Sequence, residues 1–118
     1  MIEIASERPK DVSPNALASA QPFEGSAIAI YYQTLKWAEH DTRLAPRLFA
    51  HVLAHEIGHN LQQIAVHSKT GVMKASWTGE DYSLMGNTSL RFEAGDIESI
   101  HAGLAARTAR IATLSAKR

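Results

Sequence analysis

The chain has 118 residues, of which 45% are hydrophobic and 20% charged, a composition typical of one globular domain and not of a disordered segment. Lys and Arg together number 12, as do Asp and Glu, and this balance argues against a surface built for nucleic acid or for an anionic membrane. The absence of cysteine excludes disulfide bonds, thiolate zinc sites and cysteine nucleophiles.

No segment of the sequence reaches the length of a membrane span. The first ten residues read MIEIASERPK, with acidic residues where a signal peptide has its basic start, and no long apolar run follows them. We therefore expect neither a membrane partner nor an export signal in this chain. A secreted or periplasmic location would require the chain to be a fragment of a longer precursor.

The N-terminal part predicts two short strands separated by a loop. Residues 2–5 alternate apolar and polar side chains, and residues 26–32 read SAIAIYY, a short apolar and aromatic run that follows Gly25. Residues 7–25 contain three prolines and several Ser and Asn residues, which favours a loop. The strand at 26–32 is either an edge strand that pairs with an extended peptide or an interior strand.

The strongest periodic signal predicts an amphipathic helix over about residues 44–64. Asp41 or Thr42 can cap its start, and Pro46 suits its first turn. Apolar side chains then recur at steps of three and four residues. They are Leu44, Leu48, Phe49, Val52, Leu53, Ile57, Leu61 and Ile64.

The remaining third of the chain predicts a long structured loop and a second helix. Residues 66–87 have no sustained period and contain three glycines, and loops of this length inside a compact domain are usually functional. The second helix is expected over about residues 96–116 with Asp96 as its cap. Its inward face should carry Ile97, Ile100, Leu104, Ile111 and Leu114.

The first helix carries an H-E-x-x-H motif, formed by His55, Glu56 and His59. Two histidines four residues apart lie on one face of a helix, so both imidazoles can bind the same ion. Zinc accepts imidazole nitrogen readily. Glu56 lies next to the first histidine, where its carboxylate can reach a metal-activated water and act as general base. The alternative is a helix that merely carries surface histidines.

A catalytic zinc site usually has three protein ligands and an open fourth position. His67 is the nearest candidate for the third ligand. In a continuous helix it would lie about 12 Å beyond His59 along the axis, so the chain must leave the helix near residues 63–66 and fold back. Glu80, Asp81 and Glu93 are the alternative third ligands.

The order of these motifs resembles the active-site segment of metzincin zinc metalloproteases. The matching stretches read HEIGHNL at 55–61, HS at 67–68 and GVM at 71–73. The resemblance is closest to a group of small uncharacterised bacterial metzincin-like proteins with the pattern H-E-I-x-H…R/V-H-S-x-x-G-V-M-K-A-x-W. Here that pattern is followed by DY at 81–82, LRF at 90–92 and DIE at 96–98. The resemblance covers roughly residues 2–104.

The resemblance implies a single zincin-like catalytic domain of the α+β class over residues 1–118. Such a domain has a small mixed sheet, a long active-site helix and a second C-terminal helix. It also implies zinc as the cofactor, a peptide or protein as the substrate, and a turn over residues 71–75 that places Met73 beneath the metal. Met85 is an alternative for that methionine, and ordinary packing is an alternative role for Met73.

Two departures from the metzincin pattern stand out. The family has Gly three residues after the second histidine and its third histidine three residues later, whereas this sequence has Gln62 and Ala65 there. The family also has an N-terminal helix and further strands before the active-site helix, so the resemblance implies a domain that lacks part of that region. Exposed sheet edges would then favour self-association.

The sequence allows more than one role for three further side chains. His51 precedes His55 by one helical turn and either orients a ligand or packs as an ordinary histidine. Trp77 and Tyr82 either line a substrate cleft or steady an oxyanion, or they pack in the core or its rim.

Two functions from different classes follow. The first is a zinc-dependent peptidase in which His55, His59 and His67 hold the metal and Glu56 is the general base. The second is a catalytically inactive or truncated zinc-stabilised domain whose metal serves folding or partner binding. The intact Glu56 favours the peptidase.

Overall fold

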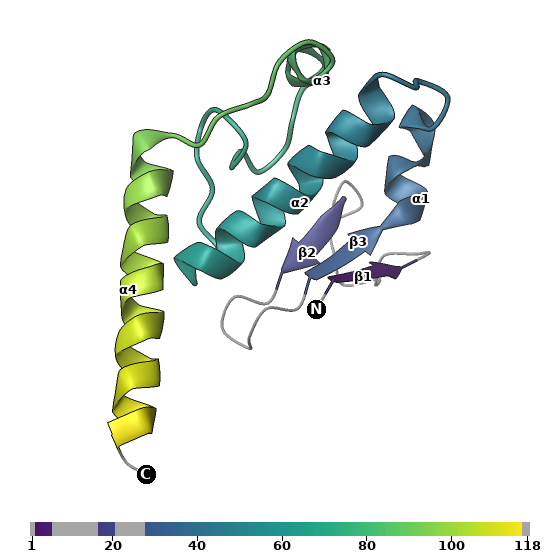
Figure 1. Cartoon of the computed structure of the whole chain (residues 1–118). Helices are drawn as coiled ribbons and strands as arrows, with labels where there is room; N and C mark the ends of the chain where they lie inside the picture. The colour runs from purple at the N-terminus through teal and green to yellow at the C-terminus, as the bar shows by residue number, and fades with distance from the viewer. Residues whose placement is uncertain (1, 6–16, 21–27, 117–118) are drawn as a thin grey trace.

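A computed structural model describes residues 2–5, 17–20 and 28–116 (Figure 1). The described strands are β1 (Ile2–Ala5), β2 (Ala18–Ala20) and β3 (Ile28–Tyr31). The described helices are α1 (Tyr32–Leu35), the 3-10 helix η1 (Lys36–Ala38), α2 (Leu44–Gln62), α3 (Gly79–Met85) and α4 (Ala94–Ala116). The predicted α+β class is confirmed. None of the helices in the described ranges has the length and apolar character needed to cross a membrane.

The three strands form a small mixed sheet in the order β1-β3-β2. β1 runs parallel to β3, with Ile2 opposite Ile28, and β2 runs antiparallel to it, with Ala18 opposite Ile30. β3 is therefore the central strand, and Ile28, Ile30 and Tyr31 are buried. Of the two readings of residues 26–32, the interior strand is correct, and the edge strand that would pair with a peptide is excluded.

Helix α2 crosses one face of this sheet (Figure 1). It begins at the predicted residue, where the Asp41 carboxylate accepts hydrogen bonds from the backbone N–H groups of Arg43 and Leu44 at 3.1 and 2.9 Å. It ends at Gln62, two residues before the predicted end. Leu48 and Val52 on α2 pack against Ile28 and Ile30 of the sheet in the hydrophobic core, because the apolar stripe of the helix has a face of matching character beneath it.

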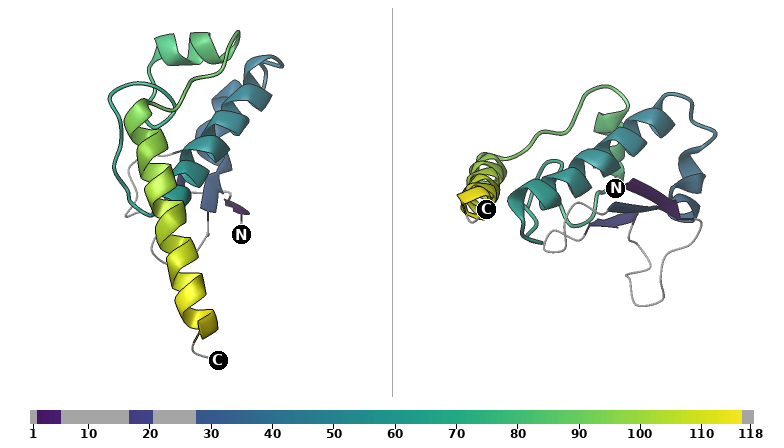
Figure 2. Two further views of the ribbon diagram at one scale, coloured as in Figure 1. Left: turned by 60° about the vertical axis from the view of Figure 1, so that its left-hand side comes forward. Right: turned by 60° about the horizontal axis from the view of Figure 1, so that its bottom comes forward.

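Helix α4 begins at Ala94, two residues before the predicted start, and Asp96 lies in its first turn. The predicted inward face of this helix is wrong for four of its five residues, and only Ile100 is partly buried. Ile97, Leu104, Ile111 and Leu114 are 40 to 66% exposed. The helix meets α2 at Gly103 and at Arg107, whose side chain donates a hydrogen bond of 3.1 Å to the Asn60 carbonyl. Its last turns extend away from the rest of the described chain (Figure 2). The apolar period marks a face, but residues 108–116, which include Ile111 and Leu114, are exposed.

Both long regions that were predicted to be loops contain regular structure. β2 lies within residues 7–25, most of which fall outside the described residues. α3 lies within residues 66–87, where Thr78 and Asp81 form a capping box at its start. The short helices α1 and η1, which join β3 to the approach to α2, have no counterpart among the predicted elements.

Candidate metal centre

Three histidine side chains converge at the C-terminal part of α2 and the loop that follows it. The Nε2 atom of His59 lies 3.1 Å from Nε2 of His55 and 3.2 Å from Nε2 of His67. All three ligand-capable nitrogens lie within 4.8 Å of one another, an arrangement that could hold a metal ion. Tetrahedral coordination at 2.0–2.1 Å separates ligand nitrogens by about 3.3 Å, so the two shortest distances fit a shared ion.

Backbone carbonyls orient two of these imidazoles. Nδ1 of His55 lies 2.7 Å from the Val72 carbonyl oxygen, and Nδ1 of His59 lies 3.1 Å from that of Ile64. A carbonyl can only accept, so each Nδ1 must carry the proton and each Nε2 a lone pair. Lone pairs at 3.1 Å repel one another unless a cation lies between them, which is the environment that a metal provides.

Burial keeps these ligands neutral. It is the main cause of the lowered pKa of His55, and it lowers the pKa of His59 to about 4, with a further contribution from the neighbouring His55. Both rings are therefore uncharged near pH 7, the form in which imidazole binds metals. His67 is exposed, so the centre opens to solvent on the side of that residue.

The chain leaves the helix at Gln63, within the predicted break at residues 63–66, and folds back to bring His67 to this place. Gln63 has φ 60° and ψ 27°, the left-handed conformation that ends many helices, and its N–H donates to the His59 carbonyl at 2.8 Å. The returning strand-like segment is held by a hydrogen bond of 2.9 Å from the Ser68 N–H to the Met73 carbonyl and by a bridge between Ser68 and Lys74.

Glu56 lies beside the histidine cluster. Its Oε1 is 4.0 Å from Nε2 of His55, and its side chain is only 8% exposed. Burial raises the pKa of Glu56 to about 7. A cation held by the neighbouring histidines would act in the opposite direction and favour the ionised carboxylate.

Met73 packs against the helix between the ligands. Its side chain is fully buried, and a Cβ added to Gly58 would lie 2.7 Å from Met73 Sδ. Glycine at position 58 thus lets the methionine approach α2 directly before His59. Met85 is also fully buried but belongs to the hydrophobic core cluster with Ile30 and Leu48. Of the two methionines, Met73 is the one that packs against the H-E-x-x-H segment of α2.

Comparisons with protein-family models, curated proteins and solved structures found no match for this chain.

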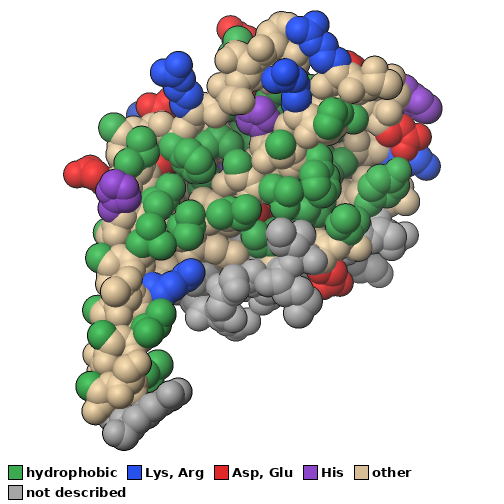
Figure 3. Space-filling model, in the orientation of Figure 1, with side chains coloured by type: hydrophobic (Ala, Val, Ile, Leu, Met, Phe, Trp, Pro, Cys, Tyr) green, Lys and Arg blue, Asp and Glu red, His purple; other side chains and the backbone are tan. Residues whose placement is uncertain are grey.

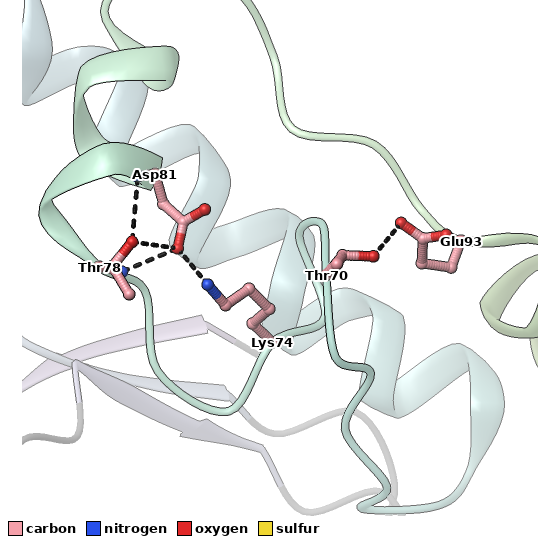
Figure 4. Close-up of polar contacts among 5 residues, drawn as sticks. All are labelled: Thr70, Lys74, Thr78, Asp81 and Glu93. Carbon is pink, nitrogen blue, oxygen red and sulfur yellow. Dashed lines mark hydrogen bonds and ion pairs between the residues drawn. The ribbon is translucent and has the colours of Figure 1, made fainter.

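The alternative third ligands lie outside the cluster, and two of them, Asp81 and Glu93, have other partners (Figure 4). Asp81 accepts a hydrogen bond from Lys74 Nζ at 2.5 Å and from Thr78 N–H at 2.8 Å. Glu93 accepts one from the Thr70 hydroxyl at 2.5 Å. Glu80 is exposed in the first turn of α3. His67 is the side chain that the structure brings together with the other two histidines.

Both ring nitrogens of His51 form hydrogen bonds with backbone groups. Its Nδ1 lies 2.6 Å from the Arg47 carbonyl oxygen, so it donates there, and its Nε2 accepts a hydrogen bond of 2.9 Å from the Leu90 N–H. The side chain thereby ties α2 to the segment before α4. It does not hydrogen-bond a member of the cluster, so the packing interpretation describes it better than orientation of a ligand.

Trp77 and Tyr82 are partly buried and pack against the hydrophobic core, as the packing interpretation expected. The Trp77 ring also lies edge-on to His55, with centroids 5.8 Å apart, and edge-on to Tyr82 at 6.4 Å. Trp77 therefore forms an apolar wall beside the centre.

Asp96, which the sequence predicts as the cap of the second helix, instead lies in the first turn of α4 and contacts the loop that carries His67. Asp96 is buried, with 6% exposure, and its carboxylate accepts a hydrogen bond of 2.5 Å from the Ser68 hydroxyl. It also contributes to raising the pKa of His55 and of His59, against the larger effect of burial. A buried acid with a partner 28 residues away has no signature in a single sequence.

Proposed function

We propose that this chain is a zinc-dependent peptidase of the metzincin type, with His55, His59 and His67 as zinc ligands and Glu56 as general base. The convergence of three imidazole nitrogens beside a carboxylate on the same helix carries the proposal.

The donor set suits zinc. Neutral imidazole nitrogen is a preferred zinc ligand, and three protein ligands with an open fourth position are typical of catalytic zinc. When bound, zinc supplies Lewis-acid chemistry that acidifies water and polarises a substrate carbonyl. The exposed position of His67 leaves a path by which substrate can approach.

The proposed catalytic role of Glu56 follows from its place and its chemistry. Among the described residues nothing hydrogen-bonds its carboxylate, so Oε1 is free to take a proton from the attacking water and to deliver it to the leaving amine. His55 and His59 are held in one tautomer by the carbonyls of Val72 and Ile64, which keeps Nε2 of each ring available for the metal.

A peptide is the proposed substrate because of the arrangement around the histidines. The H-E-x-x-H helix, the third histidine on a returning loop and Met73 packed against Gly58 together favour a metzincin-type peptidase over other zinc hydrolases.

The first experiment measures zinc content of the purified chain by elemental analysis. We expect about one zinc per chain and its loss after dialysis in His67→Ala. His40→Ala is the matched control, because the His40 side chain is 92% exposed and lies outside the cluster. Zinc that stays bound in His67→Ala would mean that another residue completes the site.

The second experiment measures cleavage of a fluorogenic peptide library by the zinc-loaded chain and by Glu56→Gln. We expect Glu56→Gln to retain zinc and to lower turnover by at least about 10²-fold, the smaller end of general-base contributions. Zinc binding without cleavage by the parent chain would favour the alternative function, a zinc-stabilised domain without turnover.

A further inference from the structure

The loop that carries His67 is fastened to the start of α4 by a buried contact. The Ser68 hydroxyl donates a hydrogen bond of 2.5 Å to Oδ1 of Asp96, and Ser68 directly follows His67 in the chain. The other carboxylate oxygen, Oδ2, accepts a hydrogen bond of 2.9 Å from the Glu93 N–H. Asp96 thus holds the loop with one oxygen and the start of its own helix with the other.

Further contacts join the same two segments. The Val72 N–H donates to the Arg91 carbonyl at 2.9 Å, and Gly71, with φ 82°, allows that carbonyl to approach where a Cβ would collide with it. The Thr70 hydroxyl donates to Glu93 on the surface (Figure 4). Among these side-chain contacts, that of Asp96 is the one with a buried acceptor and the one nearest to His67.

The position of His67 needs such a fastening. His55 and His59 are fixed by helix α2 and by carbonyl hydrogen bonds, whereas His67 is exposed on a segment outside any helix or strand. Displacements of about 1 Å are enough to spoil a metal site. A short hydrogen bond to a buried carboxylate is among the stronger contacts available to hold a loop.

We infer that Asp96 is a positioning residue of the metal centre. It acts through Ser68 to keep His67 Nε2 close enough to His59 Nε2 for both nitrogens to bind the same ion. The inference concerns the position of His67, and it rests on the proposed function for the metal that this histidine would bind.

A purely structural role for Asp96 makes a different forecast. If Asp96 only supports α4, then Ser68→Ala should leave metal affinity unchanged, because the hydrogen bond from the Glu93 N–H to Oδ2 remains. If Asp96 positions His67, then Ser68→Ala and Asp96→Ala should weaken metal binding to a similar extent, and the double variant should be little worse than either.

The test measures zinc affinity by competition with a chromophoric chelator. Ser68→Ala and Asp96→Ala should each raise the zinc dissociation constant by roughly 10–100-fold, the usual effect of removing a group that orients a ligand. Asp96→Asn, whose carbonyl oxygen can still accept from the Ser68 hydroxyl, should recover part of the loss. Thr70→Ala is the matched control, since it removes an exposed contact from the same loop, and it should change the constant by less than about 3-fold.

A metal-free readout separates this inference from the proposed function. Amide hydrogen exchange of the apoprotein should speed up at residues 68 and 72 in Ser68→Ala, by more than in Thr70→Ala, while the amides of α2 keep their protection. Unchanged zinc affinity and unchanged exchange in Ser68→Ala would overturn the inference. A parent chain that binds no zinc but shows the faster exchange would refute the proposed metal site and leave the positioning of the loop by Asp96 standing. Zinc binding that is unchanged by Ser68→Ala and by Asp96→Ala would refute the positioning role of Asp96 and leave the proposed metal site standing.

Discussion

Helices α2 and α4 carry the same kind of apolar period, yet they differ in what covers it. α2 has 19 residues, and its stripe at Leu48 and Val52 is 1 to 2% exposed against the sheet. α4 has 23 residues, and Ile111 and Leu114 in its second half are 58 and 66% exposed. Figure 3 shows hydrophobic side chains at the surface over both helices. The comparison teaches that a period of three and four residues predicts an apolar face and says nothing about whether a partner covers it.

The largest expected effect on stability comes from replacing a buried leucine of α2, compared with an exposed leucine of α4. Leu48→Ala should lower the free energy of unfolding by roughly 2–5 kcal/mol, because it removes a buried side chain and leaves a cavity. Leu114→Ala should change it by less than about 0.5 kcal/mol, because the side chain is already in solvent. Chemical denaturation of the two variants measures both values. A loss of several kcal/mol in Leu114→Ala would mean that the second half of α4 is covered in solution.

The contact between the two helices can be broken at Gly103. A Cβ there would collide with the backbone carbonyl of Leu61, at the end of α2, so Gly103→Ala should destabilise the chain by roughly 1–3 kcal/mol. Gly95→Ala is the control in the same helix, because a Cβ there meets nothing within 4 Å. That substitution should stabilise the chain by about 0.5–1 kcal/mol through helix propensity. Thermal unfolding should show a lower melting temperature for Gly103→Ala and a higher one for Gly95→Ala. Equal changes in melting temperature would contradict the close approach of the two helices at Gly103.

A third substitution tests helix α3, which packs against α2. Burial alone would raise the pKa of Asp81, but hydrogen bonds from Lys74 and Thr78 outweigh it and hold the pKa below its usual value. A carboxyl group with a lowered folded-state pKa stabilises the fold above its unfolded pKa of about 3.9, and the stabilisation is lost as the pH falls through the folded value.

Asp81→Asn should therefore lower stability by about 1 kcal/mol at pH 7, and the difference from the parent chain should shrink as the pH falls below about 4. Denaturant titrations at several pH values measure this difference. Glu80→Gln, in the same turn but exposed, is the control and should stay within about 0.5 kcal/mol of the parent. A difference for Asp81→Asn that persists undiminished in acid would rule out the carboxylate as its source.

The parts of the fold that were predictable are those with a strong local signal. The start of α2 followed from a cap at Asp41 or Thr42 and from the apolar period, and its end was predicted to within two residues. α3 was missed although the sequence contains its signal, a Thr78-x-x-Asp81 capping box. β2 has only three residues, Ala18–Ala20, with no alternation to reveal it, and its place in the sheet depends on pairing with β3.

The candidate site divides in the same way. His55 and His59 were predictable because a spacing of four residues places both on one helix face. His67 could be named as a candidate, and its role required the chain to leave the helix near residues 63–66. The residue that makes the turn could not be derived, since Gln63 adopts a conformation that usually requires glycine. The contact of Asp96 with Ser68 joins residues 28 positions apart, and no periodic or local pattern encodes it.

The smallest effect concerns this turn, which ends α2 inside the body of the domain. A residue other than glycine in the left-handed region carries a strain of about 1–2 kcal/mol. Glycine removes this strain, but it also increases the conformational entropy of the unfolded chain, which offsets part of the gain in stability. Gln63→Gly should therefore be about 1 kcal/mol more stable than Gln63→Ala, and both should keep the zinc affinity of the parent if the turn conformation is preserved. Equal stability of the two variants would mean that Gln63 leaves the left-handed region in solution. In that case α2 would continue past residue 63, and His67 would lie too far along the helix to join the other two histidines.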